Sequence, residues 1–168
     1  AADGFAFLLQ TEGPDAVGGR GGGLGYRDIT DCLAVEFDLF QNNPEQDPNG
    51  NHIAVNIDSV FHTSSIGIAA DIPEMADGNP HSVRIALVDD CIYVYLDDLN
   101  VPVINADIDL NTALDLEKDI FAGFTAATGM SYAHHDILSW EFQATGELRQ
   151  ITDRTGGGPC IDCCAIDH

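Results

Sequence analysis

Residues 36–52 hold the side chains of this chain that are best suited to bind a metal ion, in the order E-F-D-L-F-Q-N-N-P-E-Q-D-P-N-G-N-H. The segment that leads into them, residues 32–40, alternates with the two-residue period of a β-strand. Because alternate side chains project from the same side of a strand, one side is expected to carry Glu36, Asp38, Phe40 and Asn42. Asp47 follows in a polar loop, and His52 opens a second apolar run. A hairpin would therefore bring carboxylates, an amide and an imidazole together.

This combination of ligand types points to metal binding. Hard oxygen ligands suit Ca²⁺, and an added imidazole suits Mn²⁺, Zn²⁺ or a similar transition ion. The alternative is an acidic strand edge with a turn after it. We prefer the metal site, because an exposed edge strand does not need Glu36 and Asp38 on the same face as a histidine that returns across the hairpin.

The rest of the chain consists of short segments with strand periodicity, separated by glycine, proline and aspartate turns. One short helical turn is expected at residues 110–116, and Trp140 is expected to be buried. Such a pattern predicts an all-β sandwich or jelly roll built from antiparallel hairpins. Besides residues 32–40, strands are predicted at 4–10, 53–57, 65–70, 81–88, 91–96, 101–104, 121–128 and 137–142.

The composition restricts the partners. Asp and Glu total 28 against 6 Lys and Arg, which gives a formal net charge of −22 over 168 residues. Such a charge argues against nucleic acid and against anionic membrane surfaces, and it is compatible with bound divalent cations or a saline extracellular setting. No run approaches the roughly 18 apolar residues that span a bilayer, so no membrane insertion is expected.

The five cysteines leave several interpretations open. Cys32 and Cys91 lie in predicted strands and are either buried thiols or a disulfide. Cys160, Cys163 and Cys164 crowd the end of the chain, where one C-x-x-C with His168 is a weak zinc signal. Pairing with something downstream is favoured over zinc, and it would place the protein in an oxidising compartment.

The hairpin resembles the metal site of the legume-type (L-type) lectins, in the form E-x-D-x-F-x-N, then D-P, then N-H-I. Further blocks extend the resemblance over nearly all of residues 1–143: A-D-G-F-A-F, G-G-G-L-G, and G-F-T-A-A-T-G followed by H-D-I-L-S-W-E-F. The resemblance implies a concanavalin A-like jelly-roll sandwich of antiparallel sheets. It also implies a Ca²⁺ and a transition ion, usually Mn²⁺, behind a surface that binds glycans or glycoconjugates without chemical turnover.

The resemblance also assigns metal ligands. It implies that the transition ion is held by Glu36, Asp38, Asp47 and His52. It implies that Ca²⁺ is held by Asp38, Asn42, Asp47 and the backbone carbonyl of Phe40. His62 falls where family members place a residue near a metal-bound water, although a histidine in a polar loop is more often simply solvated.

The implied sugar site lies on four loops. Asp3 would accept hydrogen bonds from two ring hydroxyls, and the peptide before it would be cis. Asn42 would place its carbonyl oxygen on Ca²⁺ and its amide N–H groups on the sugar. The other implied sugar-binding residues are Gly22 through its backbone N–H, Met130 and Ser131 in the loop that decides which sugar fits, and Phe40 or Tyr132 as an apolar surface.

The resemblance further predicts how the chain is organised. The lectin domain is expected at residues 1–145, without the strands that family members carry upstream of Asp3. Residues 146–168 are expected to be a Gly- and Cys-rich linker or the start of a following region. Because a single shallow sugar site binds weakly, we expect part of a longer multidomain or oligomeric protein, extracellular or on the cell surface (secreted).

Two rival functions remain. Jelly-roll endoglucanases carry an E-x-D-x-E strand motif with two catalytic carboxylates. Glu36 and Asp38 begin such a motif, but Phe40 stands where the second Glu would be, and His52 would be unexplained. The other rival is a calcium-stabilised adhesion module without sugar binding, in which metals support folding only.

Overall fold

The structure is a computed structural model that describes residues 1–145 and 160–164. It divides into two compact units, each built on one five-stranded antiparallel sheet. The first unit comprises Ala1–Asn79 and Asn111–Asp136, and the second comprises Pro80–Leu110 with the described part of Ile137–His168. As predicted, nearly all regular structure is β. In the described part of the chain, no helix is long and apolar enough to cross a membrane.

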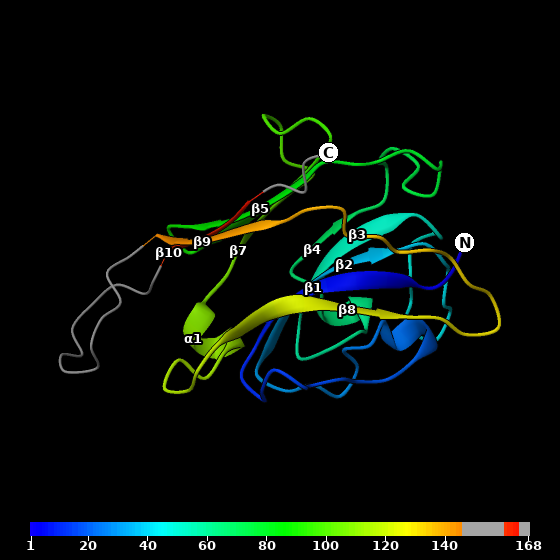
Figure 1. Ribbon diagram of the computed structural model, residues 1–168. Coiled ribbons are helices and arrows are strands. Elements are labelled where there is room, and N and C mark those ends of the chain that lie inside the picture. The colour runs from blue at the N-terminus through cyan, green and yellow to red at the C-terminus, as the bar shows by residue number, and fades with distance from the viewer. Residues whose placement is uncertain (146–159, 165–168) are drawn as a thin grey trace. The chain divides into compact units, whose positions relative to one another are not determined.

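The sheet of the first unit has the strand order β4-β3-β2-β1-β8 (Figure 1). Two short 3-10 turns lie in its loops, η1 (Gly21–Gly23) and η2 (His62–Ser64). Its strands are β1 (Gly4–Gln10), β2 (Cys32–Asp38), β3 (His52–Ile57), β4 (Gly67–Ala69) and β8 (Phe121–Ala127).

The central strands of this sheet are buried on both faces, which explains their long apolar runs. On one face, the rings of Phe5 and Phe37 stack with centroids 4.8 Å apart, and Phe7 meets Phe124 edge-on at 5.6 Å. The opposite face carries the side chains on which the glycine-rich loop packs. That cluster consists of Ala6, Leu8, Leu24, Tyr26, Ile29, Cys32, Ala34 and Val60.

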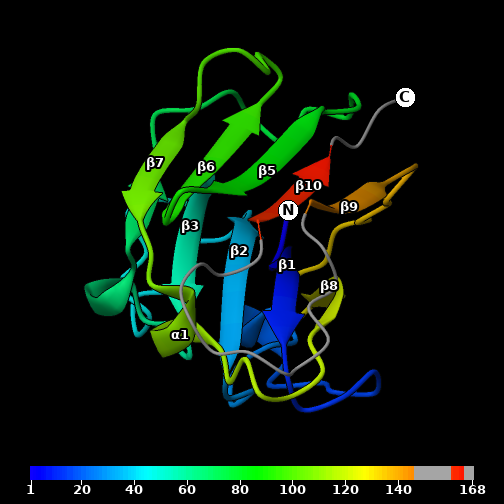
Figure 2. The same cartoon turned by 90° about the vertical axis from the view of Figure 1, so that its left-hand side faces the viewer.

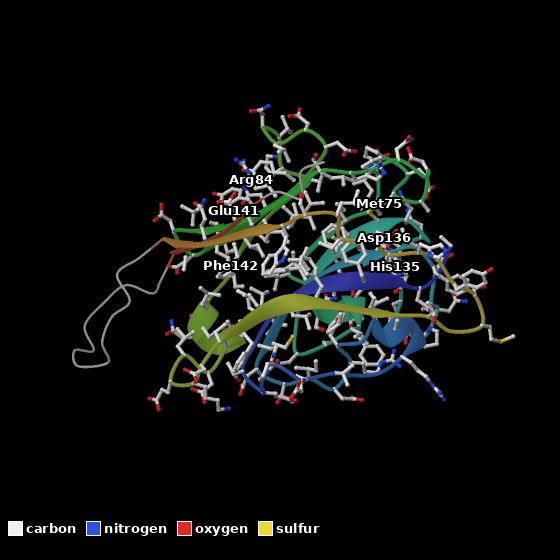
Figure 3. All side chains as sticks on the ribbon, viewed as in Figure 1. Met75, Arg84, His135, Asp136, Glu141 and Phe142 are labelled. Carbon is white, nitrogen blue, oxygen red and sulfur yellow. The ribbon has the colours of Figure 1, made fainter. Side chains whose placement is uncertain are left out.

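The sheet of the second unit has the order β7-β6-β5-β10-β9 (Figure 2). Its hairpin turns at Asp89 and Asp90, which both have positive φ, as a two-residue turn between twisted strands requires. Arg84, labelled in Figure 3, lies over the ring of Tyr95 at 3.8 Å from the centroid. The strands are β5 (Val83–Val88), β6 (Cys91–Leu96), β7 (Ile104–Asp107), β9 (Glu141–Thr145) and β10 (Cys160–Cys164).

Several predicted boundaries were wrong. β2 ends at Asp38 and not at residue 40, because the Asp38 carboxylate accepts a hydrogen bond from the Phe40 N–H at 2.7 Å and turns the chain. The strand predicted at 101–104 begins only at Ile104, and the one at 65–70 shrinks to Gly67–Ala69. The helical turn is shorter than predicted, at α1 (Leu110–Ala113).

The prediction that Trp140 is buried was also wrong. β9 begins at Glu141, one residue after it, and lies at the edge of its sheet. Trp140 is 46% exposed, and its ring lies 6.2 Å from that of Phe142.

The two cysteines in the predicted strands are free thiols and not a disulfide. Cys32 is buried in the first unit, and burial raises the pKa of its thiol to about 12. Cys91 is half-buried at the start of β6. The linker predicted over residues 146–159 lies outside the described residues, as does His168. The domain boundary at residue 145 therefore stays a prediction, although Cys160–Cys164 forms the strand β10 between β5 and β9.

Candidate metal centre and the loops beside it

The hairpin of β2 and β3 brings the predicted metal ligands together at one end of the sheet in the first unit. Asp38 lies directly opposite His52 in the register of the two strands. Glu36 lies two residues before Asp38, so its side chain is on the same side of the sheet. Two groups of side chains have potential ligand atoms within 4.8 Å of one another. They are Glu36, His52 and His62, and Asp38, Asp47 and His52.

These side chains are buried, which makes their charges costly. His52 is fully buried, and Glu36 and Asp38 are 2% and 3% exposed. Burial, opposed by the hydrogen bond from Phe40 and assisted by nearby carboxylates, raises the pKa of Asp38 to about 8. Carboxylates that share a buried site disfavour one another's charged forms, and a cation among them stabilises those forms. The electrostatics of this cluster therefore favour a bound cation.

The loop after β2 adds oxygen atoms to the cluster. The backbone N–H of Asn42 donates to Asp47 Oδ2 at 2.5 Å, which holds the loop closed. Within the described residues, Asn42 Oδ1, Glu36 Oε1 and His52 Nδ1 are buried without a hydrogen-bond partner. A buried polar atom without a partner is costly, and a metal ion would satisfy such oxygens. The donor set present here, with carboxylates, an amide oxygen and imidazole, fits both Ca²⁺ and a transition ion.

His62 lies within this centre, where the resemblance puts a residue near a metal-bound water, and it is not the solvated loop histidine that a polar loop alone would suggest. Its Nε2 lies 3.1 Å from Glu36 Oε1 and 3.0 Å from Asp47 Oδ1. Burial alone lowers the pKa of His62, but the hydrogen bond to Asp47 and the neighbouring carboxylates raise it above its ordinary value overall. The sequence carries no periodic signal for this placement, because His62 enters from the turn η2 and not from a strand.

Asp3 and the glycine-rich loop lie next to the hairpin loop. The peptide bond between Ala2 and Asp3 is cis, as the resemblance implies. The Asp3 carbonyl accepts a hydrogen bond from the Leu39 N–H at 2.8 Å, which ties Asp3 to the segment after β2. The Oδ2 atom of Asp3 is buried and, among the described residues, has no hydrogen-bond partner. Burial raises the pKa of this carboxyl, and His135 opposes the shift.

Two glycines line the space around Asp3 and Asn42. A Cβ on Gly22 would lie 2.7 Å from Asn42 Cγ, closer than any side chain tolerates. A Cβ on Gly129 would lie 3.2 Å from Asp3 Oδ2. The structure therefore places Gly22 next to Asn42, and Gly129, which sequence reasoning did not single out, next to Asp3. Gly129 could have been found from the sequence, because it is the last glycine of the block G-F-T-A-A-T-G.

The loop after β8 carries the two remaining predicted residues. Met130 is fully exposed and Ser131 is exposed, so neither is held by packing. The Gly129 N–H donates to the Ser131 carbonyl at 3.2 Å, which closes a tight turn beside Asp3. Phe40 is 42% exposed and not turned into the core. His135, labelled in Figure 3, follows this loop, and its ring centroid lies 6.0 Å from that of Phe5.

Comparison with known proteins identifies the family. The sequence model of the legume lectin domain matches residues 1–157. The chain therefore belongs to the legume lectin domain family. It is 29% identical over 162 residues to a seed lectin of Styphnolobium japonicum, covering 88% of this chain and 52% of that protein. It is 30% identical over 160 residues to the L-type lectin-domain containing receptor kinase S.7 of Oryza sativa subsp. japonica, covering 86% of this chain and 22% of the kinase.

A solved structure shares the fold. The winged bean acidic lectin complexed with methyl-alpha-D-galactose superposes with a TM-score of 0.61 at 24% identity, over 77% of this chain and 55% of that chain. This likeness confirms the predicted fold class, a concanavalin A-like jelly-roll sandwich of antiparallel sheets. The chain spans about half the length of the seed lectin that it matches.

Proposed function

We propose that this chain binds glycans or glycoconjugates through a Ca²⁺- and transition-ion-dependent site, without chemical turnover. The observation that carries the proposal is the pair of buried acceptors Asp3 Oδ2 and Asn42 Oδ1, which lack partners among the described residues. They lie beside Gly22 and Gly129, where a Cβ would meet Asn42 or approach Asp3. Acceptors beside glycine backbone suit a ligand that is rich in hydroxyl groups and comes close to the main chain.

The proposed role of each residue follows from the hydrogen-bonding groups that it offers. An ionised Asp3 accepts hydrogen bonds from two sugar hydroxyls, and charge-assisted bonds of this kind are stronger than neutral ones. Asn42 turns its carbonyl oxygen toward Ca²⁺, which leaves its amide N–H groups for the sugar. The Gly22 N–H is a further donor. Met130 and Ser131, on the exposed loop, contribute contacts that differ from one sugar to another.

The metal ions would hold the sugar-binding residues in place, and each ion has its own set of proposed ligands. Glu36, Asp38, Asp47 and His52 would hold a transition ion. When bound, the ions supply the positive charge that keeps these buried carboxylates ionised. Ca²⁺ would be held by Asp38, Asn42, Asp47 and the Phe40 carbonyl.

Hydrolysis of a glycosidic bond is disfavoured by the surroundings of Glu36. This residue is 2% exposed, and its Oε2 accepts a hydrogen bond from the Tyr26 hydroxyl at 2.5 Å. A nucleophile or general acid must reach the substrate, and Glu36 is enclosed instead. Cleavage of a chromogenic β-glucan by the purified chain, abolished in Glu36→Gln, would overturn this part of the proposal.

A glycan array tests the proposed function. The chain is applied with Ca²⁺ and Mn²⁺, and again after treatment with a chelator. We expect binding to a subset of glycans with the ions and loss of that binding with the chelator. Binding to no glycan under either condition, while Ca²⁺ still raises the melting temperature, would favour a calcium-stabilised adhesion module instead.

Replacing Gly22 with alanine should weaken glycan binding at least tenfold. The new methyl group would meet the Asn42 side chain at 2.7 Å, so the amide must turn away from the sugar. Isothermal titration with a glycan from the array measures the loss. The matched control is Gly123→Ala on β8, where a Cβ meets nothing within 4 Å. Equal affinity of Gly22→Ala and the wild type would remove Gly22 from the site.

The setting of the chain is part of the proposal. An extracellular or cell-surface location fits its high negative charge and its Ca²⁺ ligands. One of its relatives is a receptor kinase in which the matched region is 22% of the whole. We propose that this chain is likewise part of a longer multidomain or oligomeric protein. Several weak sugar sites would then act together and raise the overall avidity.

A further inference from the structure

The two histidines of the metal centre point their Nε2 atoms at each other. His52 Nε2 and His62 Nε2 are 3.0 Å apart, although the two rings lie edge to face. Glu36 Oε1 and Asp47 Oδ1 lie 3.1 Å and 3.0 Å from His62 Nε2. Four potential ligand atoms thus converge, one from each of four side chains. Two nitrogen ligands that share one transition ion at about 2.0–2.1 Å lie roughly 3 Å apart, which matches this spacing.

A chain of hydrogen bonds determines which nitrogen of His62 carries the proton. The Tyr26 hydroxyl donates to Glu36 Oε2 at 2.5 Å, because a carboxylate only accepts. The Tyr26 oxygen then accepts from the Asn56 amide at 2.9 Å. This orientation leaves Asn56 Oδ1 as the acceptor for the Ser65 hydroxyl at 2.5 Å.

Ser65 uses its only proton in that bond. Its oxygen must therefore accept from His62 Nδ1, at 3.0 Å. In the neutral imidazole, Nδ1 then carries the hydrogen, and Nε2 presents its lone pair to the cluster. In metal-binding histidines, a hydrogen bond from the other ring nitrogen fixes the tautomer and the orientation of the ring. The chain of hydrogen bonds through Ser65 does the same for His62.

Three of the converging atoms, Glu36 Oε1, Asp47 Oδ1 and His62 Nε2, are then acceptors, and His52 Nε2 has at most one proton to share among them. The lone pair of His62 Nε2 faces Glu36 Oε1, which is 2% exposed as a residue and has no hydrogen-bond partner among those described. A proton on Nε2 could serve only one of its neighbours at a time. A cation would satisfy all four atoms together, and this observation points to a ligand independently of the acidic cluster itself.

We propose that His62 is a direct ligand of the transition ion, in a centre of two imidazoles and three carboxylates that selects Zn²⁺ or a similar ion over Mn²⁺. The centre consists of Glu36, Asp38, Asp47, His52 and His62, and it rests on the metal site of the proposed function. Imidazole suits Zn²⁺, Cu²⁺ and Ni²⁺, whereas carboxylate and water suit Mn²⁺. A second imidazole in place of a water therefore shifts the preference toward Zn²⁺.

The test measures metal affinity directly. Zn²⁺ and Mn²⁺ affinities are determined by competition against a chromophoric chelator and by equilibrium dialysis, with Ca²⁺ present throughout. For His62→Ala, we expect Zn²⁺ affinity to fall 10- to 100-fold and Mn²⁺ affinity to change less than threefold. The control is His81→Ala, a histidine of the second unit that pairs with Asp97. Equal changes for both ions, or no change for Zn²⁺, would overturn the proposal.

A second variant keeps His62 and disturbs only its orientation. Ser65→Ala removes the acceptor of the Nδ1 hydrogen, and we expect roughly a tenfold loss of Zn²⁺ affinity. Ser65→Thr keeps the hydroxyl and should restore the affinity. The visible spectrum of bound Co²⁺ should change in His62→Ala, whereas Ser65→Thr should keep the wild-type spectrum. A wild-type Co²⁺ spectrum in His62→Ala would show that His62 is not a ligand.

Failure of this inference is distinguishable from failure of the proposed function. Glycan binding by the wild-type chain with Ca²⁺ and either transition ion reports on the sugar site alone. If glycans bind but His62→Ala leaves the Zn²⁺ preference unchanged, only the His62 inference is wrong. If Zn²⁺ binding depends on His62 but no glycan binds, the metal centre stands and the carbohydrate proposal is wrong.

Discussion

Replacing Asp38 with alanine is expected to abolish glycan binding and to remove the stabilisation that metal ions provide, in the same preparation. Asp38 lies in the buried cluster opposite His52, and its loss takes away a ligand that both proposed ions share. At a metal concentration one hundred times Kd, binding stabilises the folded state by about 2.7 kcal/mol. For a chain of this size, that corresponds to roughly 5–10 °C in melting temperature.

The comparison is made with and without chelator by differential scanning fluorimetry. The wild type should melt at a higher temperature with Ca²⁺ and a transition ion, whereas Asp38→Ala should show no increase. With chelator, the wild type should melt at the same temperature as Asp38→Ala or at a lower one. The metal-free wild type buries the Asp38 carboxyl, whose charged form is disfavoured there. The control is Asp71→Ala, an exposed residue of the same unit. Normal binding of sugar and metal by Asp38→Ala would refute the assigned site.

Raising the pH should have opposite effects on the metal-free and the metal-loaded protein. In the metal-free protein, burial raises the pKa of Asp38 from 3.8 to about 8. Between these values, the folded state holds a proton that the unfolded chain has released. The stabilisation from the bound proton on Asp38 is complete below pH 3.8 and is lost as the pH rises toward about 8. The raised pKa values of Asp3 and His62 act in the same direction.

Metal binding reverses this dependence. The carboxylates and His52 must be deprotonated to serve as ligands, so metal affinity increases as the pH rises. Between pH 5 and pH 8, we therefore expect the melting temperature to fall in chelator and to rise, or fall far less, with Ca²⁺ and Zn²⁺ at fixed free concentrations. Acid should act on glycan binding as a chelator does. Parallel pH profiles with and without metal would contradict a metal role for the buried carboxylates.

Much of the metal centre can be predicted from local sequence. Glu36 and Asp38 are two residues apart on one strand, and His52 opens the next strand of the same hairpin. Strand periodicity and hairpin pairing are local rules, so residue spacing alone places these side chains on one face. The all-β class follows from the same rules, because alternation and turn residues recur along the chain. Strand ends are less predictable, as the early end of β2 at Asp38 shows.

Other parts of the site depend on contacts between distant segments. Gly22 meets Asn42 and Gly129 approaches Asp3 only because three loops gather at one end of the first sheet. No sequence period relates these positions. The register among the glycines of residues 18–25 is ambiguous in the sequence, and the contact with Asn42 singles out Gly22.

The amino-acid sequence by itself determined the hairpin of hard ligands and one imidazole, because the spacing of those residues on paired strands puts them on one face at one end of the hairpin. The family resemblance puts His62 near a metal-bound water, but only the tertiary structure brings its Nε2 to within 3.1 Å of Glu36 Oε1, from the turn η2. Its orientation depends on Tyr26, Asn56 and Ser65, which come from three separate segments and touch only after folding. An orientation fixed by such a network leaves no signal in local periodicity. Whether the proposed metal centre has one imidazole or two is therefore decided by packing and not by residue spacing.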